Sequence, residues 1–239
     1  VGAFAGEVLT TGAYCTLIGY TSGRNLTTAT GCTVVGHNSL IAATTGNNNT
    51  AIGINVMYQA TTGYNNTCMG VGAGAVVTTG YSNTFIGING GMSLTTGNNN
   101  TCLGLNSDVP SSSATNTVTL GDGNISNLRC ADTSISSLSD RRDKTDIVDI
   151  PLGLNFVNKL RPVKFKWDIR NVEEGNTYQG KVRSGFIAQE LQEAQLGSEY
   201  LNLVMDSNPD KLEAKQGKLI PVLVKAIQEL SAKNDALEA

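Results

Sequence analysis

Seven glycines in the first half of the chain are spaced 17 residues apart without interruption. A fixed period of this kind is typical of a stacked repeat, in which one short unit recurs and each copy packs on its neighbours. Residues 1–125 are therefore predicted to form a repeat domain and not an enzyme-like globular domain. The glycines are Gly19, Gly36, Gly53, Gly70, Gly87, Gly104 and Gly121.

Each copy of the repeat indicates a short strand that ends in a tight turn. Threonine stands three residues before the spaced glycine in the first six copies, and a large apolar residue directly precedes the glycine in all seven. Threonine and β-branched residues favour strands, whereas glycine permits a positive φ or a close backbone approach. The apolar column consists of Ile18, Val35, Ile52, Met69, Ile86, Leu103 and Leu120.

A unit of 17 residues is too short for a two-helix repeat. It fits one coil of a β-solenoid or one turn of three intertwined chains, so the predicted fold is a mainly β shaft of either kind. The column gives only one or two large apolar side chains per coil, and aromatic residues make up 5% of the chain. Because this core is thin for a lone chain, we expect a homotrimer whose apolar columns point to a shared threefold axis or interchain core.

Composition changes sharply near residue 138. Residues 1–138 carry six charged side chains and 21 glycines, whereas the remaining residues carry 31 charged side chains and six glycines. Two domains with different physics are therefore predicted, a shaft at 1–125 and a second domain at 139–239, with a connector at 126–138. Because the chain starts at Val1 with no signal-like segment, we expect it to be a fragment of something longer.

Charge and composition also exclude several classes of function. The net charge of −3 is near balance and no basic stripe is present, so a nucleic-acid partner is not expected. No apolar run approaches ~18 residues, so membrane insertion is not expected. The repeats hold too few charged residues to place a pair of carboxylates on adjacent coils, so a polysaccharide-degrading site is not predicted either.

The cysteines and the single histidine give no sign of a metal, a cofactor or a catalytic triad. Cys15 and Cys32 share one repeat position, and Cys68 and Cys102 share another, which indicates small apolar fillers of a column. His37 is the only histidine, so Ser-His-Asp and Cys-His catalysis within this chain are excluded. We therefore expect neither a metal site nor a cofactor.

The second domain is predicted to mix helices and strands. Apolar spacing favours a short helix over 151–160, alternation favours a strand over 163–168, and the polar residues 170–183 suit a hairpin turn or long loop. Residues 185–190 begin as a strand and pass into a helix to about residue 195. The last segment has heptad spacing, which predicts a coiled-coil helix with one polar seam position; a terminal helix packed on its own domain is the alternative. The seam consists of Ile220, Leu223, Ile227, Leu230, Asn234 and Leu237.

Four segments of the second domain together resemble a known protein family. The opening is Ser139-Asp140-Arg141-Arg142-Asp143-Lys144, which places a hydroxyl and an amine five residues apart. It is followed by Leu160-Arg161-Pro162-Val163-Lys164-Phe165-Lys166-Trp167, by Gly185-Phe186-Ile187-Ala188-Gln189-Glu190, and by the apolar segment that begins at Ile220. In this order, over residues 139–239, they resemble the intramolecular chaperone domain of phage tailspikes and tail fibres, also called the S74 peptidase domain.

The resemblance implies a self-cleaving trimerisation chaperone attached to a virion tail fibre that is assembled in the host cytoplasm. It implies that Ser139 is the nucleophile, that Lys144 is its base, and that the bond cut is Leu138–Ser139. The shaft would then meet a host surface receptor, either a polysaccharide or a protein. The alternative is a bacterial trimeric adhesin whose C-terminal domain is a permanent trimerisation domain without proteolysis.

A lysine amine is protonated at neutral pH and acts as a base only where its surroundings favour the neutral form. Burial and the neighbouring Arg141 and Arg142 would favour the neutral form, whereas Asp140 and Asp143 would oppose it. The sequence leaves the balance between these effects open.

Overall fold

The computed structural model describes residues 1–131, 136–168 and 179–238. The chain divides into two compact units, Val1–Ile125 and Ser126–Ala239, which are described separately below. The polar segment 170–183, predicted as a hairpin turn or long loop, lies largely outside the described residues, as does part of the connector 126–138.

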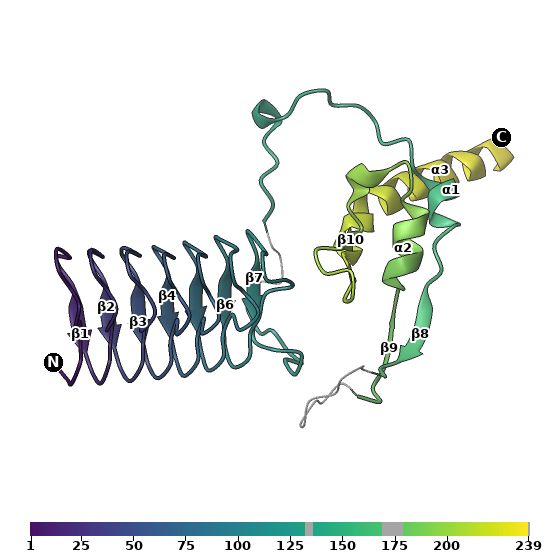
Figure 1. Cartoon of the computed structure of the whole chain (residues 1–239). Coiled ribbons are helices and arrows are strands. Elements are labelled where there is room, and N and C mark those ends of the chain that lie inside the picture. Colours follow the sequence, from purple (N-terminus) through teal and green to yellow (C-terminus); the bar gives the residue numbers. More distant parts are fainter. Residues whose placement is uncertain (132–135, 169–178, 239) are drawn as a thin grey trace. The chain divides into compact units, whose positions relative to one another are not determined.

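The first unit is a β-solenoid, in which the coils of one chain stack on one another (Figure 1). Of the two predicted shaft architectures, this is the solenoid and not the intertwined fibre. Seven three-residue strands pair in parallel and in sequence order. Paired residues are one 17-residue repeat apart, as in Thr50 with Thr67. The strands are β1 (Thr16–Ile18), β2 (Thr33–Val35), β3 (Thr50–Ile52), β4 (Thr67–Met69), β5 (Thr84–Ile86), β6 (Thr101–Leu103) and β7 (Val118–Leu120).

The middle residue of the strands faces the interior of the solenoid. Successive side chains of a strand point to opposite faces, so a three-residue strand places its first and third residues on one side and its second on the other. The interior strand positions in β2 to β6 are fully buried, and they are small except in β5. Larger residues from the loops, including Leu26, Leu40, Val56 and Met57, fill the remaining space. The inward strand residues are Val34, Ala51, Cys68, Phe85 and Cys102.

The apolar column that precedes the spaced glycines lies outside this core. Five of its seven members are 37–48% exposed, and Val35 and Ile52 are partly buried. A second exposed column stands one residue after the first six glycines, where five of the six residues are large and hydrophobic and 46–56% exposed. The second column consists of Tyr20, His37, Ile54, Val71, Ile88 and Leu105.

Two further features explain residue types that the repeat requires. Gly53 has φ +139°, and a Cβ added there would lie 2.6 Å from the carbonyl oxygen of Gly70 in the next coil, so only glycine fits. A ladder of buried asparagines runs through the solenoid: the Nδ2 of Asn66 donates to Asn49 Oδ1 at 3.2 Å and to the Gly80 carbonyl at 2.9 Å. Such ladders satisfy buried polar groups from coil to coil.

In the part of the second unit that the structure describes, there are two small antiparallel sheets and three helices. The strands β8 (Val163–Lys166) and β9 (Val182–Gly185) pair with each other, and β10 (Val204–Met205) pairs with β11 (Glu213–Ala214). The helix predicted over 151–160 is shorter in the structure, α1 (Leu154–Val157), with Gly153 as its N-cap residue and Asn158 as its C-cap residue. The helix α2 (Ala188–Ala194) follows β9, and α3 (Ile220–Glu238) ends the chain. Single 3₁₀ turns are η1 (Arg141–Asp143), η2 (Glu199–Leu201) and η3 (Gln216–Leu219).

The helix α3 packs on its own unit without using its heptad seam. Its buried residues are Val222 and Ala226, and Val222 joins the core formed around Phe156 and Leu191. The apolar seam residues are instead exposed, from 42% for Leu223 to 86% for Leu237. The helix therefore has one face against its domain and a second apolar face open to solvent in the single chain.

Candidate functional site

The segment that opens the second domain is an exposed, extended stretch of chain. Every residue from 136 to 149 is exposed, and Leu138 is fully so. Residues 136–140 belong to no helix or strand. The peptide bond between Leu138 and Ser139 is therefore in an accessible part of the backbone.

The single turn η1 follows this segment, and Asp140 begins it. The Asp140 carboxylate accepts a hydrogen bond from the backbone N–H of Arg142 at 2.8 Å, which is the usual way an aspartate caps the start of a helical turn. At the other end, the backbone N–H of Lys144 donates to the carbonyl of Arg141 at 3.2 Å. These two bonds hold the chain in a turn between Ser139 and Lys144.

The turn brings together the two residues that the sequence analysis singled out. The Lys144 Nζ donates a hydrogen bond to the Ser139 Oγ at 2.5 Å. The five-residue spacing is therefore used locally, across one helical turn. A hydroxyl in contact with an amine is the arrangement required for a serine nucleophile with a lysine base.

The charges around this contact are partly compensated. The Arg142 guanidinium donates to the Asp140 carboxylate, with Nη2 to Oδ2 at 2.6 Å, and with the backbone bond it lowers the pKa of Asp140. The same pair raises the pKa of Arg142. Two of the four neighbouring charges that the sequence left in balance are thus engaged with each other. What the single chain does not supply is burial, which would favour a neutral amine.

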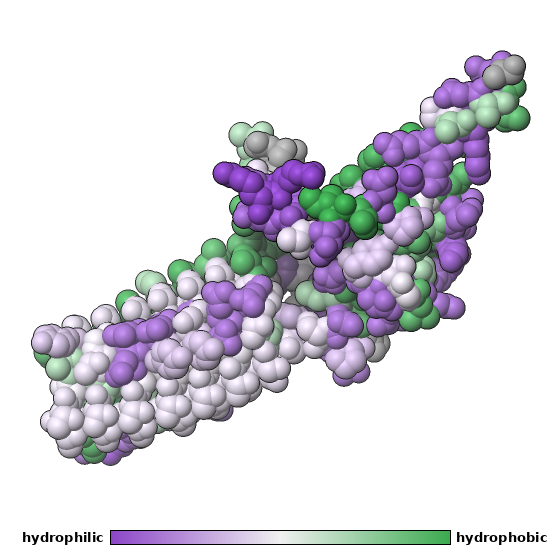
Figure 2. All heavy atoms as spheres, turned by 90° about the horizontal axis from the view of Figure 1, so that it is seen from above, coloured by the Kyte–Doolittle hydropathy of each residue, from purple (hydrophilic) through white to green (hydrophobic). Residues whose placement is uncertain are grey.

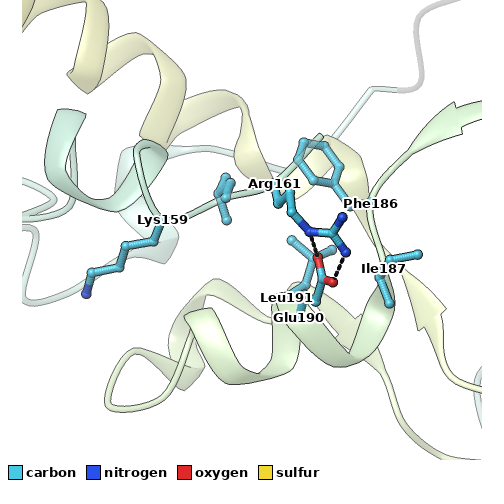
Figure 3. Close-up of a pocket in the computed structure, with 7 residues that line it drawn as sticks. Lys159, Arg161, Phe186, Ile187, Glu190 and Leu191 are labelled. Carbon is cyan, nitrogen blue, oxygen red and sulfur yellow. Dashed lines mark hydrogen bonds and ion pairs between the residues drawn. The ribbon is translucent and has the colours of Figure 1, made fainter. Parts of the chain in front are cut away.

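A second cluster connects two of the motif segments (Figure 3). Arg161, just after α1, forms a two-pronged ion pair with Glu190 of α2, in which Nε donates to Oε2 at 3.1 Å and Nη2 donates to Oε1. The pairing raises the pKa of Arg161. The two side chains line a small pocket with Phe186, Ile187 and Leu191.

Glu190 had no role that could be assigned from the sequence, and in the structure its partner lies 29 residues away. The sequence signal that connects them is that Arg161 belongs to the motif segment 160–167 and Glu190 to the segment 185–190. An exposed Arg–Glu pair contributes little to stability, about 0–1 kcal/mol. Its two-pronged geometry does fix how the segment after α1 lies on α2.

Cys32, Cys68 and Cys102 are buried in the solenoid and behave as apolar fillers, as predicted, whereas Cys130 is exposed and follows the solenoid. Burial raises the pKa of Cys68 to about 12 and that of Cys102 to about 11, which keeps both thiols protonated. Over the described ranges 1–131, 136–168 and 179–238, no three His, Cys, Asp or Glu side chains gather in a way that could hold a metal ion. Within the same ranges no helix has the length and apolarity needed to cross a membrane.

Comparison with known protein families gives a match within the second unit. Residues 139–200 match the family described as Peptidase_S74, chaperone of endosialidase. The match begins at Ser139 and includes Lys144, Arg161 and Glu190. Comparisons with curated proteins and with solved structures give no significant match.

Proposed function

We propose that this chain is the C-terminal part of a phage tail fibre or tailspike. The proposal starts from the match of residues 139–200 to the endosialidase-chaperone family. The solenoid is a trimeric shaft for host attachment, and the second unit drives trimerisation and register before it releases itself. The observation that carries this proposal is the contact between Lys144 Nζ and Ser139 Oγ, at the first residues of the family match and directly after a repeat shaft.

The proposed cut is at the Leu138–Ser139 bond. In the reactive form the Lys144 amine is neutral and accepts the proton of the Ser139 hydroxyl, the reverse of the direction in the resting contact. Ser139 Oγ then attacks the carbonyl carbon of Leu138, and the peptide nitrogen leaves as the free amine of Ser139 after it takes that proton. The resulting ester between Leu138 and Ser139 Oγ is hydrolysed by water, which leaves a new carboxylate on Leu138.

The timing of the cut follows from burial. Because the segment 136–149 is exposed in the single chain, its amine lacks the low-dielectric surroundings that favour the neutral form. Assembly of three second units would cover exposed surface and supply that burial. The protease then becomes active only after assembly, so that the chaperone is not lost before it has acted.

The repeat gives the reason for a chaperone. Slipping one chain by 17 residues places threonine on threonine and glycine on glycine, so a misregistered trimer is nearly as good as the correct one. A non-repetitive unit at one end fixes the register once. The exposed seam of α3 supports this role, since heptad-spaced apolar residues are the usual means of association between helices. After cleavage the shaft is held by slow unfolding.

The remaining partners follow from this role. The shaft meets a receptor on the host surface, either a polysaccharide or a protein, and the fibre is a virion component assembled in the host cytoplasm. The alternative is a bacterial trimeric adhesin in which the second unit stays attached. The mass of the expressed chain separates the two, because only the first predicts release of the second unit.

A truncation experiment tests the chaperone role. Expression of residues 1–138 alone is expected to give insoluble or misregistered shafts, whereas the same residues obtained from the folded full chain remain an intact trimer in light scattering. If residues 1–138 expressed alone fold into the same trimer, the second unit is not needed for assembly and the chaperone proposal is wrong.

A further inference from the structure

The outside of the solenoid carries two columns of exposed apolar side chains, one in the strands and one just after them. The first is the third residue of each strand, and the second is the residue that follows each of the first six spaced glycines. This surface, called the column face below, consists of Ile18, Val35, Ile52, Met69, Ile86, Leu103 and Leu120 together with Tyr20, His37, Ile54, Val71, Ile88 and Leu105. Figure 2 shows hydrophobic residues following one another along an edge of the repeat unit, with near-neutral residues over most of the rest of that view.

The column face is large and uncharged. No Asp, Glu, Lys or Arg occurs among these thirteen residues, and the position after the seventh glycine is Asp122, which closes the second column. Half-exposed side chains of this number present on the order of 800 Å² of apolar surface, more than the ~300–600 Å² patch of a typical monomer and close to what one partner contributes to a stable interface. The residues inside the solenoid have their own core and do not need this surface.

The spacing of the columns indicates what covers them. Successive rungs repeat at the strand spacing, ~4.8 Å, along the whole sheet. A surface that matches this period over seven coils is another solenoid with the same repeat. We infer that the column face binds the column faces of further copies of this chain, with identical rungs at the same level. The inference rests on the proposed trimeric shaft and names the surface that forms it.

The face also carries information on register that the repeat as a whole lacks. The second column is aromatic in its first two rungs, where Tyr20 and His37 stack at a centroid distance of 5.4 Å, and aliphatic in the next four. With level rungs, rings of one copy meet rings of another and aliphatic residues meet aliphatic residues. A slip of one coil would bring the His37 imidazole against Ile54. The shaft therefore opposes slippage at its N-terminal coils while the second unit fixes register at the other end.

Thiol cross-linking of the full chain tests this surface. In a Cys130→Ser background, Ile88→Cys is expected to give linked chains with a short bismaleimide reagent, because identical rungs meet. The matched control is Thr79→Cys, an exposed position in the Thr-Thr segment of the same repeat array, which is expected to stay unlinked. Mixed assembly of Ile54→Cys chains with Val71→Cys chains is expected to link like with like and not across rungs.

The outcomes separate this inference from the proposed function. If light scattering gives a trimer but Ile88→Cys does not link, or links no better than Thr79→Cys, the column face is not the interface although the chain still assembles. Links between Ile54→Cys and Val71→Cys as abundant as like-with-like links would overturn level rungs. A monomeric full chain overturns both the inference and the proposed trimer.

Discussion

Glu229 of α3 accepts a hydrogen bond from the backbone N–H of Leu154, the first residue of α1, at 2.8 Å and 75 residues away in sequence. A carboxylate at this position satisfies a donor that the helix itself leaves unpaired and lies at the positive end of the helix dipole. The bond fastens the short helix α1 to the helix that carries the exposed heptad seam.

The first prediction concerns this bond. Glu229→Ala is expected to destabilise the second unit by about 1 kcal/mol, since a partly buried donor loses a charged acceptor. Guanidinium unfolding followed by the fluorescence of Trp167, the only tryptophan, measures it. Gln228→Ala, on the exposed neighbouring position, is the control and should change stability by less than ~0.5 kcal/mol. Equal effects of the two substitutions would show that the bond contributes nothing.

The second prediction concerns the glycine stack of the solenoid. Gly53→Ala is expected to cost at least about 2 kcal/mol, because it strains a positive φ and pushes a methyl against the Gly70 carbonyl. Gly123→Ala is the matched control, since a Cβ there meets no atom within 4 Å. Denaturant unfolding followed by far-ultraviolet circular dichroism compares them. A Gly53→Ala shaft as stable as the control would contradict the stacking geometry.

The third prediction concerns thiol reactivity. At pH 8 a thiol with a pKa of about 12 is thiolate in about 1 part in 10⁴, so Cys68 is expected to resist iodoacetamide in the folded shaft. Cys130 is exposed and should be alkylated first. Peptide mass mapping before and after unfolding in guanidinium gives the order. Labelling of Cys68 at the rate of Cys130 in the folded protein would mean that the solenoid core is open.

The fourth prediction is a pH dependence at the Ser139–Lys144 turn. Arg142 lowers the pKa of Asp140 from its ordinary value of 3.8. For a lowered carboxyl pKa, the stabilising contact is present above the ordinary value and is lost as pH falls through the lowered one. Carboxyl carbon NMR should therefore place the Asp140 midpoint below 3.8, and Arg142→Ala should move it back toward 3.8. Arg141→Ala is the control and should leave it lowered. A wild-type midpoint at or above 3.8 contradicts the ion pair.

Much of the shaft was predictable because its signal is local and repeated. The short strand and the glycine turn were read from one unit and are found at β3 and Gly53. The direction of the apolar column was less accessible. In a strand such as Thr50-Ala51-Ile52, hydrophobicity alone would place Ile52 inside. Alternation instead places Ala51 in the interior, where Val56 and Met57 from the following loop fill the remaining space.

In the second unit, the elements were predictable and their long-range contacts were not. The strand at β8, the helix α2 and the terminal helix α3 follow from periodicity. The pairing of Arg161 with Glu190 and of Leu154 with Glu229 joins residues 29 and 75 positions apart, and no periodic pattern carries that information. The Ser139–Lys144 contact was accessible because it spans a single turn.

The most direct test of the account is the intact mass of the chain after assembly, without added protease. The wild-type protein is expected to yield two pieces, 1–138 and 139–239, in place of the 25.0 kDa chain. Ser139→Ala should stay whole because the nucleophile is gone, and Lys144→Arg should stay whole because a guanidinium remains protonated, while both variants still assemble. A wild-type trimer that keeps the intact 25.0 kDa mass under all folding conditions would contradict self-release.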